Sequence, residues 1–270
     1  MTASDVVARP VGKPLAGDIR VLAGVTSPEL GNTRDVLVYL PPSHQRGGGP
    51  FPVVYMHDGQ NLFDPVTSFA GEWRVNETLE RLAGEGIEAI AVAIPNMGME
   101  RVDEYSPFRD ERRGGGRGDR YLEFVVRTLK PEIDRRFRTR PDRACTGIMG
   151  SSMGGLISLY GFFRHDTVFG FAGVMSPSLW FGGGAIFDVV KNSRAPWSGA
   201  IYLDIGTGEE RRAVRDARAM ARLLRRRAGG PRHGLMYVEE RGAAHHESAW
   251  AGRFERAARF LISPCAGRPD

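Results

Sequence analysis

Cysteine is scarce in this sequence, which has two, Cys145 and Cys265, among 270 residues. Cys145 lies in a short apolar run and Cys265 in the polar C-terminal tail, so we expect free thiols and no disulfide between them. The cysteines and histidines also lack the spacing of a metal-binding motif, and we expect neither a metal ion nor a cofactor.

Long apolar runs are missing as well. No stretch approaches the roughly 20 apolar residues that cross a bilayer, and the polar start, Met1-Thr-Ala-Ser-Asp5, has no apolar region of a signal peptide. We therefore predict a cytoplasmic protein with no membrane partner. The hydrophobic fraction of 41% is nevertheless ample for a large core.

Lysine is scarce too: the chain has only Lys13, Lys130 and Lys191, so its net charge of +5 comes almost wholly from arginine. A basic balance raises the question of nucleic-acid binding, but the arginines are scattered among acids on the expected helix faces. The densest group, residues 109–120, resembles an arginine-glycine RNA-binding segment without aromatic side chains on which bases could stack. We interpret it as a flexible surface loop and expect no nucleic-acid partner.

The sequence does contain a regular alternation of short apolar runs and helical segments. This alternation is typical of a mainly parallel sheet covered on both faces by helices. We predict one α/β domain over residues 18–262, with an eight-stranded sheet whose first pair is antiparallel, between a flexible arm (1–17) and a tail (263–270). The expected strands are 18–25, 33–40, 51–56, 87–94, 144–149, 169–175, 200–205 and 235–239; the expected helices include 73–83, 121–137 with a kink at Pro131, 212–227 and a last one ending near 261, and a long loop covers 95–118.

One segment organises the functional prediction. Gly150-Ser-Ser-Met-Gly154 fits the pattern G-x-S-x-G between an apolar run and a helix-compatible run, which is the strand, sharp turn and helix of a nucleophile elbow. Ser152 at its centre is the candidate nucleophile. We expect a strained backbone at this serine and glycines where side chains would collide with the neighbouring strand and helix.

A serine hydroxyl needs a base, and the base needs a third group that orients it. In an elbow-type hydrolase the chain order is serine, acid, histidine, each after a strand. His245-His246 follow the last strand, and we expect one of the two to be the base. We favour Glu209 as the acid because it lies just beyond a strand end, whereas Asp204 lies inside that strand and Glu210 is placed to cap the next helix.

A tetrahedral intermediate also needs backbone N–H donors. We expect one from Met153, directly after the nucleophile, and the other from the turn after the third strand, at Gly59 or Gln60. Gly59 would let the backbone approach a substrate closely.

Five segments together resemble the putative-esterase family of α/β-hydrolases, which includes esterase D-like, feruloyl and enterochelin esterases. The resemblance runs from about residue 18 to residue 261, and the segments agree in order as well as in residues. They are Tyr55-Met-His-Asp-Gly-Gln-Asn-Leu-Phe-Asp64, Gly150-Ser-Ser-Met-Gly-Gly155, Ser176-Pro-Ser-Leu-Trp180, Gly206-Thr-Gly-Glu209 and His245-His-Glu-Ser-Ala-Trp250.

This resemblance implies an α/β-hydrolase fold with Ser152 as nucleophile, Glu209 as acid and His245, rather than His246, as base. It also implies that Trp180 and the loop from Arg101 to Pro107, which contains Tyr105, border the substrate pocket. From the residues alone, Trp180 fits pocket wall or packing equally, Trp250 fits packing, and Arg101 could bind a substrate carboxylate or pair with Glu104.

The predicted activity is that of a serine carboxylic-ester hydrolase, acting through an acyl-enzyme on a small or aromatic ester. Two other enzyme hypotheses share the same residues: hydrolysis of a catecholate-siderophore lactone, which a positive pocket would favour, and acyl transfer to an alcohol. A catalytically silent binding module is the alternative from a different class. The expected partner is a small-molecule ester, and the sequence carries no prediction of oligomeric state.

Overall fold

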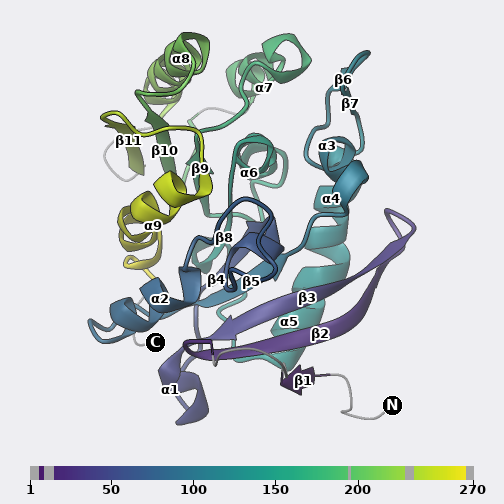
Figure 1. Cartoon of the computed structure of the whole chain (residues 1–270), viewed down its shortest axis with the longest axis vertical. Coiled ribbons are helices and arrows are strands. Elements are labelled where there is room, and N and C mark those ends of the chain that lie inside the picture. The colour runs from purple at the N-terminus through teal and green to yellow at the C-terminus, as the bar shows by residue number, and fades with distance from the viewer. Residues whose placement is uncertain (1–5, 9–14, 194–195, 229–233, 266–270) are drawn as a thin grey trace.

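The computed structural model describes residues 6–8, 15–193, 196–228 and 234–265. Within these residues nine strands form one sheet in the order β1-β2-β3-β5-β4-β8-β9-β10-β11 (Figure 1). The six strands from β5 to β11 are mutually parallel, and β1, β2 and β3 are antiparallel to their neighbours. Their bounds are β1 Val6–Ala8, β2 Asp18–Ser27, β3 Asn32–Leu40, β4 Val53–His57, β5 Ile90–Ile94, β8 Thr146–Ser151, β9 Phe171–Met175, β10 Ala200–Gly206 and β11 Gly234–Glu240.

The predicted α/β arrangement with a mainly parallel sheet is therefore confirmed, and all eight predicted strands are present. The ninth strand, β1, lies in the segment expected to be a flexible arm, where it pairs with β2 from Val6 opposite Leu22 to Ala8 opposite Arg20. Three residues are too few to produce a readable period, so backbone pairing alone defines this strand. The rest of the expected arm up to residue 14, and residues 266–270 of the expected tail, lie outside the described residues.

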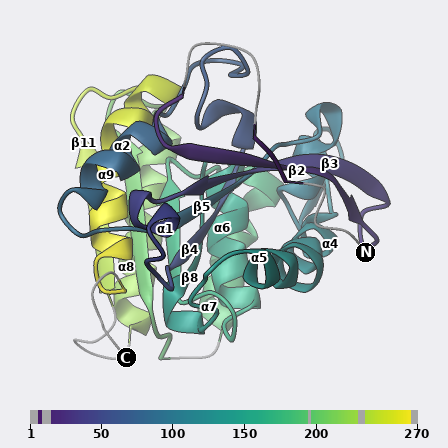
Figure 2. The same cartoon turned by 90° about the horizontal axis from the view of Figure 1, so that it is seen from below.

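Helices cover both faces of the sheet, because successive side chains along its parallel strands point to opposite faces and both sets are apolar. On β4, Val53 and Tyr55 join one core cluster and Val54 and Met56 the other. The second cluster is covered by α2 (Val75–Ala83) and α9 (Glu247–Ile262), and the first by α4 (Gly118–Glu123), α5 (Lys130–Arg136), α6 (Met153–Arg164), α7 (Ile186–Asn192) and α8 (Arg211–Arg227) (Figure 2). None of the described helices has the length and apolar character needed to cross a membrane.

The helix expected over 121–137 is present in three parts. Between α4 and α5 the segment Phe124–Leu129 is π-helical, and the N–H of Lys130 bonds to the carbonyl of Val125, five residues back. Pro131 follows directly; it has no N–H to give to a carbonyl one turn earlier, so the regular ladder is interrupted at the predicted place.

The segment expected to be a long loop, 95–118, carries local structure. After β5 it forms a 3₁₀ turn, η2 (Gly98–Glu100), the short helix α3 (Arg101–Glu104) and a hairpin of β6 (Arg109–Asp110) and β7 (Gly114–Gly115). The arginine-rich part, expected to be a flexible surface loop, lies at the surface but makes long-range contacts: the guanidinium of Arg113 lies 5.2 Å from the centroid of the Trp180 ring, and Arg117 donates to the carbonyl of Leu30 at 2.7 Å. These contacts join residues far apart in the sequence, which composition cannot reveal.

Both cysteines are buried, and neither is in a disulfide. Cys265 is not part of an exposed polar tail, because it is buried three residues after the end of α9 and its thiol donates to the carbonyl of Ala144 at 3.1 Å. Burial raises the pKa of Cys265 to about 12.

Candidate active site

The polar residues singled out in the sequence follow the carboxyl ends of parallel strands. Asp58 and Gly59 come after β4, Ser152 after β8, Glu209 after β10 and His245 after β11. Parallel strands bring their carboxyl ends to the same edge of a sheet, where ligands of open α/β folds bind. These residues therefore gather at one edge although they span almost 190 positions of the chain.

Ser152 occupies the turn between β8 and α6 in a strained conformation, with φ 57° and ψ −121°. Its N–H bonds to the carbonyl of Met175 at 3.0 Å, which fixes the turn against β9. A Cβ on Gly150 would lie 2.9 Å from the carbonyl carbon of Gly154, so the collision expected at this glycine is present. The elbow thus presents the serine side chain at the sheet edge at the expense of local strain.

His245 links Ser152 to Glu209. Its Nε2 lies 3.0 Å from the Oγ of Ser152, and its Nδ1 lies 2.7 Å from Oε2 of Glu209. Its ring is nearly perpendicular to that of Trp250, with ring centroids 5.0 Å apart. The adjacent His246 instead accepts the N–H of Ser248 and caps α9, so His245 is the one of the pair within reach of the serine.

Glu209 is held by three donors. Its Oε1 accepts the hydroxyl of Ser176 at 2.6 Å and the N–H of Gly206 at 2.9 Å, which leaves Oε2 for His245. Burial favours the protonated form of Glu209, but the hydrogen bonds from His245, Ser176 and Gly206 outweigh it and hold its pKa below the usual value. The neighbouring Glu210 stands exposed at the start of α8 and makes no side-chain capping bond.

A buried ion pair lies behind the carboxylate. Arg253 of α9 contacts Asp204 of β10 through Nε at 3.0 Å, and both side chains are almost completely buried. The same guanidinium donates to the hydroxyl of Ser176 at 2.8 Å. Sequence reasoning named Ser176 only as part of a segment that resembles the family and gave it no role. It did not single out Arg253, because an arginine on a predicted helix is normally a solvated side chain.

Gly59 and Gln60, the expected backbone donors, form a 3₁₀ turn, η1 (Gly59–Asn61), after β4, and Met153 begins α6. The first N–H groups of a helical turn have no hydrogen-bond partner within that turn. Packing gives a reason for glycine at position 59 in addition to the expected one: a Cβ there would lie 2.6 Å from the carbonyl carbon of Ala93 and 2.7 Å from the nitrogen of Ile94. Close packing on β5 by itself requires a glycine here.

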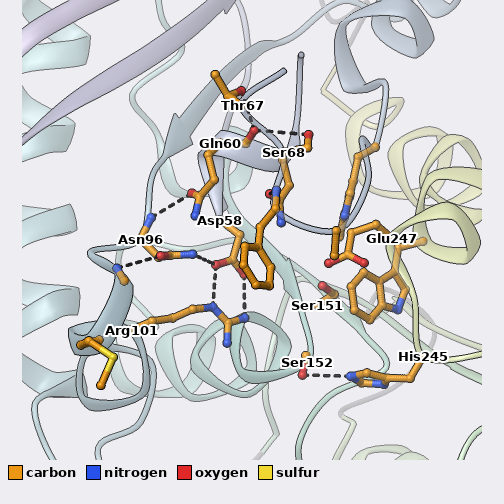
Figure 3. A pocket seen from close by; sticks show the side chains of 17 residues that line it. Asp58, Gln60, Thr67, Ser68, Asn96, Arg101, Ser151, Ser152, His245 and Glu247 are labelled. Carbon is orange, nitrogen blue, oxygen red and sulfur yellow. Dashed lines mark hydrogen bonds and ion pairs between the residues drawn. The ribbon is translucent and has the colours of Figure 1, made fainter. Parts of the chain in front are cut away.

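A cavity of about 1050 Å³ opens beside Ser152 (Figure 3). It is formed by the end of β4, the loop before α2, the loop after β5 and the start of α9. Its lining is Asp58, Gln60, Asn61, Thr67, Ser68, Phe69, Ala70, Trp73, Asn96, Gly98, Met99, Arg101, Ser151, Ser152, His245, Glu247 and Trp250.

Arg101 lines this cavity with its charge already paired. Its Nε and a terminal nitrogen bind the two carboxylate oxygens of Asp58 at 2.6 and 2.8 Å, and Asn96 holds the same carboxylate at 2.6 Å (Figure 3). Burial alone would lower the pKa of Arg101, but the bonds to Asp58 outweigh it and the pKa is raised. The pairing of Arg101 with Glu104 that the sequence permitted is absent, because Glu104 binds the buried Arg34 at 2.7 Å.

The other two predicted pocket residues do not line this cavity. Tyr105 is fully buried; its hydroxyl accepts the N–H of Asp58 at 3.0 Å, and its ring lies 5.1 Å from the guanidinium carbon of Arg101, so it supports the ion pair from behind. Trp180 packs on Phe181 and beneath Arg113. The cavity walls Phe69, Met99 and Glu247 were missed, since they belong to irregular loops and a helix start whose sequence carries no periodic signal.

Comparison with known proteins identifies the family of this chain. The chain belongs to the family described as "Putative esterase", which matches residues 27–261. It is 27% identical over 252 residues to "Uncharacterized protein YbbA" of Bacillus subtilis (strain 168), covering 89% of this chain and 97% of that one. It is 30% identical over 143 residues to the "Siderophore triacetylfusarinine C esterase" of Aspergillus fumigatus, covering 51% of this chain and 47% of that enzyme.

Two solved structures share the fold. The BES protein from Bacillus cereus superposes with a TM-score of 0.74 at 19% identity over 94% of this chain and 98% of its own. The IroE-like serine hydrolase from Shewanella oneidensis superposes with a TM-score of 0.74 at 19% identity, over 93% of this chain and 82% of its own. The family match over residues 27–261 confirms the predicted resemblance.

Proposed function

We propose that this protein is a serine esterase with an α/β-hydrolase fold, which cleaves a carboxylic ester through an acyl-enzyme. The observation that carries the proposal is the hydrogen-bond chain from Ser152 through His245 to Glu209, at the carboxyl edge of the sheet in a member of an esterase family. A strained serine with a histidine on its hydroxyl and a carboxylate on the far ring nitrogen is the arrangement that makes an alcohol nucleophilic.

In the first half-reaction the Oγ of Ser152 attacks the ester carbonyl carbon while Nε2 of His245 takes the hydroxyl proton. The ionised Glu209 keeps the proton of His245 on Nδ1 and stabilises the cationic ring. The carbonyl oxygen becomes an oxyanion, which accepts the N–H of Met153 and one from Gln60 or Gly59. The bond to the alcohol oxygen then breaks, and His245 protonates the departing alcohol.

The second half-reaction repeats these steps with water. His245 removes a proton from a water molecule, whose oxygen attacks the acyl carbon of Ser152. Collapse of the second intermediate releases the carboxylic acid, and the proton returns from His245 to the Oγ of Ser152. If an alcohol takes the place of water, the same intermediate gives acyl transfer, and the product of a reaction with competing alcohols distinguishes the two.

A siderophore ester is the second candidate substrate. The observation in its favour is the 30% identity to an enzyme described as a siderophore triacetylfusarinine C esterase. That similarity covers about half of each chain.

The test uses p-nitrophenyl esters from acetate to decanoate, methyl ferulate and a catecholate lactone, with wild type and Ser152→Ala. We expect turnover that falls at least 10³-fold in Ser152→Ala while the fold is retained. Labelling by a fluorophosphonate, which reacts with activated serines, should likewise disappear. Turnover that persists in Ser152→Ala, or an unlabelled wild type with no turnover on any ester, would refute the proposal.

A further inference from the structure

We infer that the cavity beside Ser152 receives a large, uncharged and mainly apolar part of the ester. This inference rests on the proposed function and names the substrate class of the same site. Three observations support it: the size of the cavity, the apolar side chains at its mouth, and the ion pair that neutralises the arginine in its lining.

The mouth of the cavity gathers exposed apolar side chains. Among the described residues the exposed large hydrophobic side chains are Val66, Phe69 and Met99, at 86%, 92% and 97% exposure. Phe69 and Met99 line the cavity from two loops 30 positions apart, while Val66, in the same loop as Phe69, stays outside the lining. Apolar side chains held in water at the rim of a pocket mark a surface that a ligand covers.

The lining also includes two tryptophans that are almost completely buried. Trp73 and Trp250 form part of the lining and pack on each other with ring centroids 5.9 Å apart. The volume of about 1050 Å³ lies at the upper limit of pockets that hold drug-sized ligands. A small acyl group such as acetyl would leave most of this apolar surface in contact with water, so a larger group gains more by entering.

The charges on the lining exclude anions. Its titratable groups are Asp58, Arg101, His245 and Glu247. Both carboxylate oxygens of Asp58 bind Arg101, so the positive charge of Arg101 is already neutralised. When His245 is neutral, the carboxylate of Glu247 gives the lining a net negative charge. An anionic substrate group would have to give up water without gaining an unpaired cation, which is costly. The positive pocket that would favour an anionic siderophore lactone is therefore not present at Arg101.

The experiment measures kcat/KM in two ester series. One lengthens the acyl group of p-nitrophenyl esters from acetate to octanoate, and the other lengthens the alcohol of acetate esters from ethyl to octyl. A buried methylene contributes about 0.8 kcal/mol, or roughly fourfold. We expect kcat/KM to rise at least tenfold along the series whose variable group enters the cavity.

Variants at the rim identify the surface responsible. In the double variant Phe69→Ser/Met99→Gln we compare kcat/KM for the longest and the shortest ester of the series that responds. The ratio of these two values should fall about tenfold relative to wild type. Val66→Ser is the matched control, an equally exposed apolar side chain outside the lining, and it should leave the ratio unchanged.

The charge is tested with the p-nitrophenyl monoester of octanedioic acid, which ends in a carboxylate, against p-nitrophenyl octanoate. We expect kcat/KM for the anionic ester to be at least tenfold lower than for the neutral ester. In Glu247→Gln the difference between these two values of kcat/KM should be smaller. Three results would overturn the inference: a kcat/KM that does not change along either series, a ratio of long-chain to short-chain kcat/KM that is the same in the rim variant and wild type, or equal rates for the anionic and neutral esters. Turnover that depends on Ser152 would still support the esterase in each case. Absence of Ser152-dependent turnover on every ester would reject both.

Discussion

The hydroxyl of Ser176 donates its proton to Oε1 of Glu209 across 2.6 Å. The direction follows from the other contact of this hydroxyl, because Arg253, which has only donors, gives it a hydrogen bond at 2.8 Å. With its lone pair engaged by the guanidinium, the single proton of Ser176 is directed at the carboxylate. Oε2 of Glu209 is then left for His245, and the carboxylate cannot rotate without losing a charge-assisted bond.

Replacing Ser176 by alanine should therefore weaken catalysis without weakening substrate binding. We expect kcat to fall about tenfold, the equivalent of one hydrogen bond to a charged group, with KM little changed. Because Ser176 helps to hold the pKa of Glu209 low, its loss raises that pKa. The acid limb of the kcat/KM profile should then move to higher pH, since the carboxylate is protonated sooner as the pH falls.

Ser176→Gly is the matched control. Ser176 has a φ of 40°, which glycine adopts without strain, so this variant removes the hydroxyl and relieves the backbone. We expect it to lose activity and shift the pH profile as Ser176→Ala does. Recovery of wild-type kcat in Ser176→Gly would show that backbone conformation, not the hydroxyl, is what matters.

The two adjacent glutamates should differ sharply. Glu209→Gln keeps the shape of the side chain but cannot stabilise a cationic His245, so we expect kcat to fall by about 10³ to 10⁴. Glu210→Gln changes an exposed side chain at the start of α8 and should alter kcat less than twofold. Steady-state kinetics on one p-nitrophenyl ester measure both. Comparable losses in the two variants would contradict the assignment of Glu209.

A methyl group at Gly59 should disturb the expected backbone donors. In Gly59→Ala the new carbon meets the backbone of Ala93 and Ile94, which cannot yield as a side chain does, so η1 must shift and carry the N–H of Gln60 with it. We expect kcat to fall about 10²-fold, the effect of a displaced oxyanion donor. Gly252→Ala is the control.

Gly252 lies on the exposed side of α9, with nothing within 4 Å of an added Cβ. Alanine there should raise the free energy of unfolding by about 1 kcal/mol and leave kcat unchanged. Thermal melting and kinetics of both glycine variants check the pair. Normal kcat in a correctly folded Gly59→Ala would remove the turn after β4 from the proposed mechanism.

His57 should make the fold sensitive to acid. It is buried beneath the elbow against the hydroxyl of Tyr121 at 2.7 Å, and burial lowers its pKa from 6.5 to about 3. The unfolded chain therefore binds a proton between pH 6.5 and 3 that the folded chain does not. The contribution of His57 to the free energy of unfolding is therefore fully present above pH 6.5 and decreases as the pH falls. At pH 4 the protonation of His57 in the unfolded chain lowers the free energy of unfolding by about 3 kcal/mol.

His57→Gln removes the titration while keeping a polar side chain. Urea unfolding of both proteins from pH 7 to pH 4 measures the effect. Other groups contribute equally in the two proteins, so the difference between their pH slopes isolates His57. Parallel stability curves would mean that His57 is protonated in the fold.

The sequence by itself determined the strand and helix order, the elbow and the chemistry expected of it. These features are local: apolar runs predict buried strands, and G-x-S-x-G between a strand and a helix predicts a strained turn around Ser152. The order of Ser152, Glu209 and His245, each after a strand, was also readable, because parallel strands bring their carboxyl ends to one edge.

Only the tertiary structure decided what surrounds that chemistry. Arg101 pairs with Asp58 instead of Glu104, and Tyr105 is buried in the core. Arg253 contacts Ser176. Each of these contacts joins segments from different strands and helices. Phe69 and Met99 meet at one cavity because two loops 30 positions apart leave the same sheet edge. Such contacts depend on how side chains pack in space, and the spacing of residues along a chain carries no record of it.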